Sequence, residues 1–347
     1  MTQLPDYLSI VSDLQPVFTE LKQKYADGKW VILVDENTEK HCLPLISNYL
    51  PKYQVIQIQS GETNKNLETC AYIWQQLTDF EVDRKGLLIN LGGGVIGDMG
   101  GFCASTYKRG ISFVNMPTTL LSQVDASIGG KLGIDFHGFK NHIGLFRDPD
   151  EVIIFQTFLN TLPERELRSG FAEIIKHHLI QDTENWNSLK TSDWNTVISP
   201  SLLRHSIEIK SAVVMKDPFE KGLRKILNYG HTVGHAIETH FLAGADPLLH
   251  GEAIAAGMVI ENFIAEGKQL LNGESCNEIN GYILRIYGKA IIRETDIAAI
   301  IQLASQDKKN QNKEIRGSLL KEAGIATWDV AITQEEMRDA INRYRAL

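Results

Sequence analysis

The chain has little of several features that define other classes of protein. Its 347 residues include only four cysteines, with no CxxC spacing: Cys42, Cys70, Cys103 and Cys276. Scattered cysteines in a chain of this length predict reduced thiols and not a disulfide framework. Lysine and arginine (35) are outnumbered by aspartate and glutamate (43), so the net charge is -8. This deficit of positive charge argues against a domain-wide basic field, and so against binding to nucleic acid or to an anionic membrane surface.

Long hydrophobic runs are also missing. Stretches such as AIAAGMVI at 253–260 are far shorter than the roughly 20 apolar residues that span a bilayer. The first residues, MTQLPDYLSI, carry neither a basic segment nor an apolar run, so we expect no signal peptide. We find no repeat and no low-complexity tract. These features predict a soluble, cytoplasmic protein without a membrane partner.

The pattern of the sequence changes between its two halves. The first half has five strand-like segments, at 30–37, 53–59, 86–94, 111–117 and 151–156. Helix-like segments lie between them, at 38–49 and 66–80. The second half has helical periodicity at 163–180, 199–216, 230–242, 251–268, 295–306 and 334–346. Alternating β and α elements predict a parallel sheet covered by helices. We therefore predict an α/β domain at 1–158 and an all-α domain at 159–347.

A glycine-rich loop, LGGGVIGD at 91–98, follows an apolar strand and precedes a helical segment. Gly92, Gly94 and Gly97 match GxGxxG, a pattern that brings backbone N–H groups and a helix N-terminus close to a pyrophosphate. A tight strand-to-helix turn explains the same glycines nearly as well. Asp35 and Glu62 follow predicted strands, at the sheet edge where α/β proteins bind ligands, and are candidates for a cofactor ribose.

Positive and polar side chains gather in one glycine-rich region, 116–144, which carries Asp125, Lys131, Lys140 and Asn141. Arg109 lies just before this region, and Arg224 lies further along the chain. Together they are able to hold a phosphate or a carboxylate, since arginine offers a fork of two hydrogen bonds and lysine a point charge. The alternative is that these lysines belong to a solvated surface.

Histidines and glutamates suggest a metal site in the second half. His231 and His235 are four residues apart, which places both on one face of a helix. By spacing alone they are a ligand pair, and Glu173 with His177 is a second such pair. His231 and His250 each follow or precede glycine at an expected helix start. For His177, His178 and His240 we expect plain surface positions.

Several motifs, in the same order along the chain, resemble one family. They are GGGVIGD, Arg109 in STYKRG, PTTLLSQVDASIGGK, KNHIG, GFAEIIK, EKGLRKILNYGHTVGHAIE and HGEAIAAGM. All are similar to 3-dehydroquinate synthase, the enzyme of the second step of the shikimate pathway. The resemblance runs from about residue 30 to residue 320, and it implies a Rossmann-like N-terminal domain, an α-helical C-terminal domain, tightly held NAD, and a zinc or cobalt ion.

The resemblance also implies a reaction. The family converts 3-deoxy-D-arabino-heptulosonate 7-phosphate to 3-dehydroquinate and phosphate, in the biosynthesis of chorismate and aromatic amino acids. Transient oxidation by NAD, elimination of phosphate, re-reduction and aldol cyclisation follow one another, so no NADH is released. The arginine at the position of Arg109 can reach in from a neighbouring subunit, which implies a homodimer.

Motif positions assign roles to single residues. The implied metal ligands are Glu173, His231 and His250, whereas His235 matches a proton-transfer position and is not a ligand. The implied catalytic residues are Glu220, His235, Lys131 and Asp125. Substrate contacts match Arg109, Lys131, Asn141, Lys176, Lys210, Arg224, Asn228 and Lys308, with Lys309 as the alternative to Lys308. Cofactor contacts match Asp35, Asn37, Glu62, Lys65, Gly93, Gly94, Asp98, Thr118, Thr119, Lys140 and Thr161.

Three other functions compete with this one. Sister sugar-phosphate cyclases act on substrates without the carboxylate, and the retained Lys131, Asn141, Lys210 and Arg224 favour the carboxylated substrate. A metal-dependent oxidoreductase similar to glycerol dehydrogenase would release NADH, but the PTT-to-GSE pattern of that family is missing. A non-catalytic scaffold would have lost an acid, a base or a ligand, and none is lost.

Overall fold

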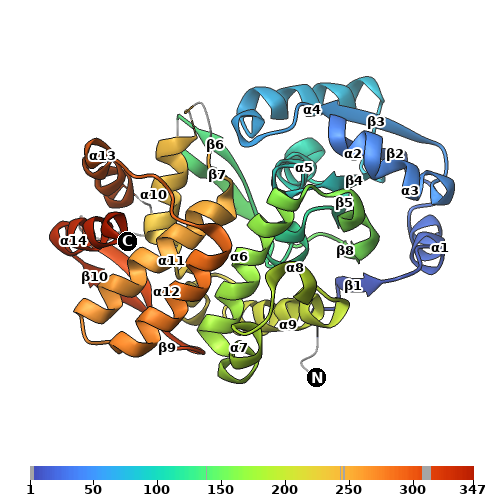
Figure 1. The fold of residues 1–347 in the computed structure, drawn as a ribbon. Helices are drawn as coiled ribbons and strands as arrows, with labels where there is room; N and C mark the ends of the chain where they lie inside the picture. Colours follow the sequence, from blue (N-terminus) through green and yellow to red (C-terminus); the bar gives the residue numbers. More distant parts are fainter. Residues whose placement is uncertain (1–3, 138, 243, 245–246, 307–313) are drawn as a thin grey trace. The chain divides into compact units, whose positions relative to one another are not determined.

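The computed structural model describes residues 4–137, 139–242, 244, 247–306 and 314–347. The chain forms two compact units, Met1–Leu167 and Arg168–Leu347 (Figure 1). The domain boundary that we place after residue 158 stays a prediction; it lies within a 3-10 helical segment, Gln156–Thr161.

Unit 1 is built on a six-stranded parallel sheet with the order β1-β8-β5-β4-β2-β3. Its strands are β1 (Leu8–Val11), β2 (Trp30–Asp35), β3 (Tyr53–Ile58), β4 (Leu87–Gly92), β5 (Ser112–Pro117) and β8 (Glu151–Phe155). Every residue of β4 is buried, as expected of a central strand that is covered on both faces. The five strands expected from the sequence are all present, and β1 is an addition that its four residues signal too weakly.

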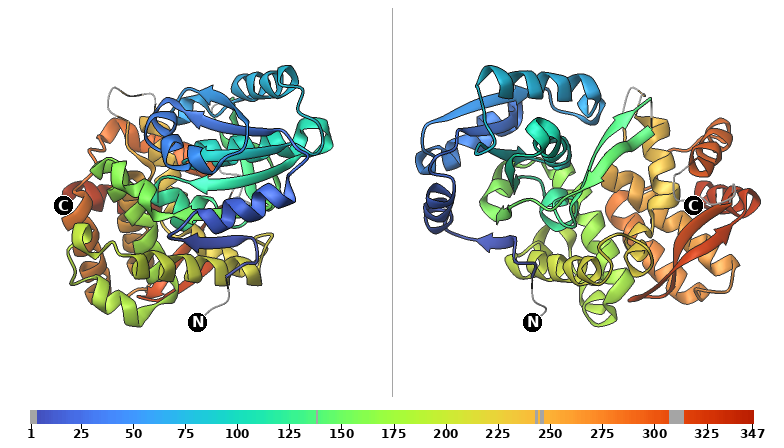
Figure 2. Two further views of the ribbon diagram at one scale, coloured as in Figure 1. Left: turned by 90° about the vertical axis from the view of Figure 1, so that its right-hand side faces the viewer. Right: turned by 180° about the vertical axis from the view of Figure 1, so that it is seen from behind.

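Helices cover both faces of this sheet. They are α1 (Gln15–Lys24), α2 (Glu36–His41), α3 (Leu43–Ile46), α4 (Leu67–Asp79) and α5 (Gly94–Thr106). Val31 and Leu33 of β2 pack in one core with residues of α4 and α5. Ile32 and Val34, which point the other way, pack in a second core with residues of α1 and α3. Figure 2 shows α1 and α4 on opposite faces of the sheet.

A hairpin that we did not predict follows β5. Strands β6 (Lys131–Phe136) and β7 (Phe139–Phe146) pair antiparallel, and β6 packs against α5. Its glycines hide the strand pattern, because glycine is disfavoured in strands. Glycine is needed here because the backbones of the two strands run close together: a Cβ on Gly144 would lie 2.3 Å from the Leu132 carbonyl oxygen.

Unit 2 is mostly helical. Its helices are α6 (Glu164–Gln181, which begins in unit 1), α7 (Thr183–Leu189), α8 (Trp194–Val197), α9 (Pro200–Lys216), α10 (His231–Phe241), α11 (His250–Gly267), α12 (Gly273–Tyr287), α13 (Glu294–Ser305) and α14 (Gln334–Ala346). The predicted α/β class and helical second half are confirmed. One correction applies: an antiparallel hairpin, β9 (Ile315–Glu322) and β10 (Ile325–Ile332), means that this unit is not all-α. The two strands flank a turn at Gly324, whose φ is +89°.

Two helices of unit 2 approach each other closely through glycine. Gly230 precedes α10 with φ +79°, and a Cβ there would lie 2.4 Å from Met258 Cγ of α11. A Cβ on Gly257 of α11 would lie 2.1 Å from the Gly230 carbonyl oxygen. Larger residues would separate the helices, so these glycines fix the position of α10 against α11. His231 and His250 are the first residues of these two helices.

Two properties expected from composition are checked by the structure. All four cysteines are buried, and none is in a disulfide. Within the described ranges, no helix is long and apolar enough to cross a membrane.

Candidate functional site

The glycine loop of unit 1 joins the buried end of β4 to the N-terminus of α5. Gly93 is the residue before the helix, and no side chain caps the first turn. Gly92 leaves no room for a side chain, since a Cβ would lie 2.5 Å from Ile96 Cγ1. A helix N-terminus exposes N–H groups without intrahelical partners, so this turn is suited to an anion.

A pocket opens at this end of the sheet. The residues that line it include Gly92, Gly93, Gly94, Asp98 and Lys131. Gly97 also lines the pocket, so the three glycines of the GxGxxG pattern share one cavity. The glycines are therefore able both to form a tight strand-to-helix turn and to line a site for a pyrophosphate.

Asp35 ends β2 next to this loop in the sheet. The connection after β2 runs through α3 on one face, and the connection after β4 runs through α5 on the other face. Neighbouring strands with connections on opposite faces form the crevice in which α/β sheets bind ligands. Asp35 Oδ1 accepts the backbone N–H groups of Asn37 (3.0 Å) and Thr38 (2.8 Å) at the start of α2. Asp35 Oδ2 takes part in neither bond.

A polar network lies beside the loop. Lys65 Nζ donates to Asp98 Oδ2 and Asn141 Oδ1, both at 2.6 Å. Burial by itself lowers the pKa of Lys65, but the carboxylates of Asp98 and Glu62 raise it above its ordinary value, so the ammonium group keeps its charge. Lys140 Nζ lies 3.3 Å from Glu62 Oε1. The network thus joins five residues that the sequence assigned to the cofactor and the substrate.

The remaining candidates of unit 1 lie near or after β5. The Thr118 N–H donates to the Gly92 carbonyl at 3.0 Å, and a Cβ on Gly93 would lie 3.1 Å from Thr119 Cγ2. Asp125 lies in a single π-helical turn, Ser122–Ala126; such turns are frequent at functional sites. Thr161 ends the 3-10 segment at Gln156–Thr161.

Arg109 lies apart from this group. It precedes β5, whereas the glycine loop and Thr118 follow β4 and β5, so the length of a six-residue strand separates them, roughly 20 Å. The side chain of Arg109 is exposed, and its φ is +70°. Among the described residues, no hydrogen bond or ion pair holds its guanidinium group.

Unit 2 brings the three predicted metal ligands together. One ligand atom each of Glu173 (α6), His231 and His250 lie within 4.8 Å of one another. His231 Nε2 lies 3.5 Å and His250 Nε2 lies 3.3 Å from Glu173 Oε1. Glu173 is fully buried. Two imidazoles and one carboxylate are a donor set that binds Zn²⁺ with a position left for substrate.

Neighbouring groups orient both imidazoles. His231 Nδ1 lies 3.0 Å from the Tyr229 carbonyl oxygen, and His250 Nδ1 lies 3.3 Å from Glu238 Oε2. Such partners fix the tautomer so that Nε2 is left to bind a metal. Burial alone lowers the pKa of His250, but Glu238 and Glu173 raise it to about 10. The two carboxylates therefore create a negative potential that suits a cation.

His235 lies close to the same group but has different neighbours. Its ring centroid is 4.9 Å from that of His231 and 5.8 Å from that of His250. A second possible grouping joins His235 to Glu238 and His250. The pair His231 and His235 does share a helix face, as the spacing predicted. His177 has another partner, since its Nδ1 lies 2.7 Å from Ser206 Oγ, so the proposed pairing of Glu173 with His177 has a competitor.

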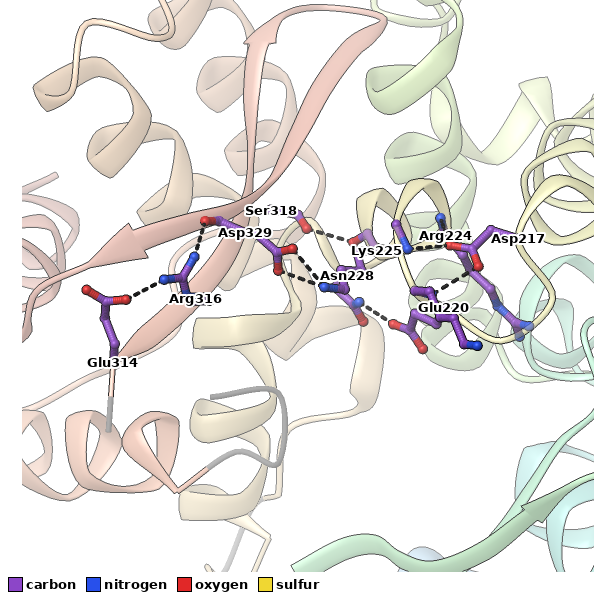
Figure 3. Close-up of polar contacts among 11 residues, drawn as sticks. Asp217, Glu220, Arg224, Lys225, Asn228, Glu314, Arg316, Ser318 and Asp329 are labelled. Carbon is purple, nitrogen blue, oxygen red and sulfur yellow. Dashed lines mark hydrogen bonds and ion pairs between the residues drawn. The ribbon is translucent and has the colours of Figure 1, made fainter. Parts of the chain in front are cut away.

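The segment before α10 holds three of the predicted substrate and catalytic residues: Glu220, Arg224 and Asn228. Figure 3 shows Asn228 donating to Glu220. Glu220 has φ +56°, an unusual conformation for glutamate that the surroundings must maintain. The carboxylate of Asp217 accepts the N–H of Arg224 at 3.0 Å, which shapes the loop. Arg224 itself is buried and donates through Nη1 to the Pro218 carbonyl oxygen.

The β9–β10 hairpin holds this segment in place. Lys225 Nζ lies 2.7 Å and 2.9 Å from the two carboxylate oxygens of Asp329. Ser318 Oγ donates to the Lys225 carbonyl oxygen at 2.6 Å (Figure 3). The β9–β10 hairpin, which was not predicted from the sequence, therefore supports the segment that carries the predicted residues Arg224 and Asn228.

Two lysines complete the candidate residues of unit 2. Lys176 and Lys210 are both buried, and Lys176 forms an ion pair with Glu173. Lys308 and Lys309 lie outside the described residues. Glu238 and the Tyr229 carbonyl, which orient His250 and His231, were not predicted from the sequence. A helical-wheel signal existed for Glu238, which lies seven residues after His231 on the same face of α10.

The expectation of surface positions was wrong for two histidines. His177 and His178 are fully buried, and His240 is partly exposed. The physical reason is that α6 is buried on all sides from Ser169 to Ile180, so it offers no solvent-facing stripe on which an amphipathic pattern would place them.

Two family models together cover residues 55–310 of the chain. Residues 55–169 match the model for 3-dehydroquinate synthase N-terminal, and residues 170–310 match that for 3-dehydroquinate synthase C-terminal. The chain belongs to the 3-dehydroquinate synthase family. A 3-dehydroquinate synthase of Parabacteroides distasonis is 39% identical over 340 residues, 96% of this chain and 95% of the relative. One from a Nitratiruptor species is 42% identical over 299 residues, 85% and 84% of the two chains.

Solved structures support the fold. A 2-epi-5-epi-valiolone synthase from Streptomyces hygroscopicus subsp. jinggangensis, with NAD⁺ and Zn²⁺ bound, has a TM-score of 0.86 at 23% identity, over 100% of this chain and 98% of the other. A probable glycerol dehydrogenase from Sinorhizobium meliloti has a TM-score of 0.65 at 14% identity, over 100% and 98%. The resemblance to the 3-dehydroquinate synthase family, the enzyme class and the fold predicted from the sequence are confirmed.

Proposed function

We propose that this protein converts 3-deoxy-D-arabino-heptulosonate 7-phosphate to 3-dehydroquinate and phosphate. One observation carries the proposal. The chain belongs to the 3-dehydroquinate synthase family, and its structure brings His231 and His250 together with the buried carboxylate of Glu173. A chain of this family that had lost its activity is expected to have lost at least one of these donors.

The residues present fit a divalent metal. Glu173, His231 and His250 supply one carboxylate and two imidazoles, and Tyr229 and Glu238 hold the rings with Nε2 directed to Glu173. We assign zinc or cobalt to this site, since nitrogen-rich donor sets favour such ions over magnesium or calcium. The Streptomyces synthase with Zn²⁺ bound supports the choice of ion.

Unit 1 fits NAD. The pocket at the glycine loop and the N-terminus of α5 suit the pyrophosphate, and we assign a ribose hydroxyl to Asp35 Oδ2 at the end of β2. The proposed contacts are those that the sequence assigned: Asp35, Asn37, Glu62, Lys65, Gly93, Gly94, Asp98, Thr118, Thr119, Lys140 and Thr161. The NAD⁺ bound to the Streptomyces synthase supports NAD as the cofactor.

The order of bond changes follows from the chemistry of the substrate. Oxidation of the C5 hydroxyl acidifies the proton on C6, and phosphate then leaves from C7. After re-reduction at C5, the ring opens and the enol carbon adds to the C2 ketone. When bound, NAD would supply the hydride acceptor and donor, and a metal held by Glu173, His231 and His250 would supply a Lewis acid for the hydroxyls. NAD is therefore not consumed.

The protein contributes proton transfer and positioning. His235 and Glu220 exchange protons with the substrate, and Asn228 holds the Glu220 carboxylate. Asp125 and Lys131 act at the reacting hydroxyls. Fixed cations hold the phosphate and the carboxylate, so most of the rate comes from orientation and electrostatics. The proposed substrate contacts are Arg109, Lys131, Asn141, Lys176, Lys210, Arg224, Asn228 and Lys308.

The proposal includes a homodimer and its location in the cell. Arg109 is exposed, free of protein partners among the described residues, and a strand length from the pocket of its own unit. We assign it to the site of a second copy in a homodimer in the cytoplasm. The domains that act in this scheme are 1–158 for NAD and 159–347 for metal and substrate.

A substrate panel tests the function. Purified protein with NAD⁺ and zinc is incubated with 3-deoxy-D-arabino-heptulosonate 7-phosphate, sedoheptulose 7-phosphate, glucose 6-phosphate or glycerol. We expect rapid phosphate release from the first substrate alone. Preference for either other sugar phosphate would identify a sister cyclase instead. Net NADH formation with glycerol would identify an oxidoreductase.

A further inference from the structure

A second cluster of metal-binding side chains lies in unit 2, apart from the three candidate ligands. One ligand atom each of His178, Asp182 and His205 lie within 4.8 Å of one another. His178 belongs to α6, Asp182 follows it, and His205 belongs to α9. His178 is five residues after Glu173, which on a helix is a rotation of about 140°. The two clusters thus use different faces of α6.

His178 is held in the form that binds metals. Its Nδ1 lies 2.7 Å from the Ile174 carbonyl oxygen, so this nitrogen must carry the proton and Nε2 must carry the lone pair. The side chain is fully buried, and Nε2 has no hydrogen-bond partner among the residues that the structure describes. A buried acceptor without a partner is unusual and costly. Burial also lowers the pKa of His178, which keeps the imidazole neutral.

Asp182 and His205 face the same point. His205 Nε2 forms a close contact with Asp182 Oδ2. Asn185 donates its backbone N–H to Asp182 Oδ1 at 3.1 Å and its amide to Asp182 Oδ2 at 2.8 Å. These bonds orient the carboxylate. A hydrogen bond between His205 and Asp182 alone would explain these two residues, but it would leave His178 Nε2 unexplained.

We propose that His178, Asp182 and His205 bind a divalent transition-metal ion, with zinc as the best match to two imidazoles and one carboxylate. Atoms that share one zinc lie about 3.4 Å apart at ligand distances of about 2.1 Å. Small side-chain rotations would bring His178 nearer and move Asp182 and His205 slightly apart to fit the ion. The His205 side chain is 36% exposed, which leaves a route by which the ion enters and a position for water. It would be a second ion in the chain only if Glu173, His231 and His250 bind the first, and that part rests on the proposed function.

The site would link three elements of unit 2. The ion joins the end of α6 to α9, and the β9–β10 turn docks beside it. There the Gly324 N–H donates to the Leu179 carbonyl at 2.8 Å, and Thr183 Oγ1 donates to the Ala323 carbonyl at 2.7 Å. We therefore assign a structural role to the ion: its binding raises the melting temperature and leaves the chemical step unchanged.

Zinc counting tests the proposal. Full-length protein carrying His250→Ala, which disables the other site, is dialysed against zinc, and bound metal is measured by mass spectrometry. We expect one zinc per chain, and none after His205→Ala is added. His240→Ala is the matched control, because His240 pairs with Asp296 outside the cluster; it should keep the zinc. An unchanged zinc content after His205→Ala, or no zinc in the His250→Ala protein, overturns the proposal.

A second variant guards against misfolding. Asp182→Asn keeps an N-cap side chain for α7, since asparagine caps as well as aspartate, but it removes the carboxylate. We expect zinc affinity to fall by at least ~10-fold, because even the loss of an outer partner costs ~10- to 100-fold. The melting temperature in chelator should stay at that of the parent protein, and only the rise caused by zinc should disappear. A zinc-induced rise equal to the parent's contradicts the proposal. In the otherwise unaltered chain, His205→Ala should keep the wild-type turnover, so failure here is separable from failure of the proposed function.

Discussion

At the scale of single residues, two histidines four apart on α10 receive different environments. His231 has its Nδ1 against the Tyr229 carbonyl and its Nε2 near Glu173. His235 contacts the other two rings but is not part of the group formed with Glu173. Equal spacing on a helix therefore does not give equal roles, because each imidazole is assigned its role by the groups that face its two nitrogens.

This difference leads to a prediction about metal content. His250→Ala removes a proposed ligand and should lower metal content and activity together. His235→Ala should keep the metal and lower kcat by about 10²- to 10⁴-fold, the usual contribution of a proton-transferring group. Metal analysis and steady-state kinetics on the same samples check both. Loss of metal from the His235→Ala protein would show that the assignment of ligands is wrong.

At the scale of secondary-structure elements, Asp35 has two tasks that a substitution can separate. Its Oδ1 caps α2, and its Oδ2 is the proposed ribose contact. Asp35→Asn should keep the cap but weaken NAD⁺ binding by ~10- to 100-fold, since a hydrogen bond to a charged group is lost. Asp35→Ala should in addition cost about 1 kcal/mol of unfolding free energy. Calorimetric titration and denaturant unfolding measure the two effects; an unchanged NAD⁺ affinity in Asp35→Asn would refute the ribose contact.

The turn between β9 and β10 gives a second prediction at this scale. Gly324 has φ +89°, and a Cβ there would lie 2.5 Å from the Thr183 backbone nitrogen. Gly324→Ala should therefore lower the unfolding free energy by ~1–3 kcal/mol. Gly281 of α12 is the matched control: it is exposed, with nothing within 4 Å of its Cβ position. Gly281→Ala should stabilise by ~0.4–1 kcal/mol.

Denaturant unfolding of the two glycine variants decides between a required and a replaceable glycine. Equal effects of the two substitutions would mean that the hairpin turn does not need its conformation. In that case, the contacts of Ser318 and Asp329 with Lys225 would not depend on the conformation of the turn.

The sequence predicted those elements whose signal is local. Buried strands such as β2 and β4 are continuous apolar runs, and the loop at Gly92 is a motif with its own geometry. The hairpins were missed because glycines weaken the pattern in β6–β7, and charged residues such as Arg316 and Asp329 interrupt it in β9 and β10. The burial of His178 was missed because it depends on elements that pack around α6 from distant parts of the chain, and no local pattern records them.

At the scale of the whole molecule, the proposed exchange of Arg109 between subunits predicts complementation. Arg109→Ala and His250→Ala proteins should each be nearly inactive. A 1:1 mixture that re-forms dimers should recover about a quarter of wild-type activity, because half of the dimers are mixed and each mixed dimer has one intact site. Activity is measured after partial denaturation and refolding. A mixture that stays inactive, although mixed dimers are shown by mass spectrometry, would place Arg109 in the site of its own chain.

The central claim is that oxidation and reduction occur within one catalytic cycle. It is tested by following phosphate, 3-dehydroquinate and NADH together in one reaction with 3-deoxy-D-arabino-heptulosonate 7-phosphate, with and without a chelator. We predict that phosphate and 3-dehydroquinate form in equal amounts, that no net NADH accumulates, and that the chelator stops the reaction. Accumulation of NADH in step with substrate loss, or no phosphate from folded protein loaded with metal and NAD⁺, would contradict the account.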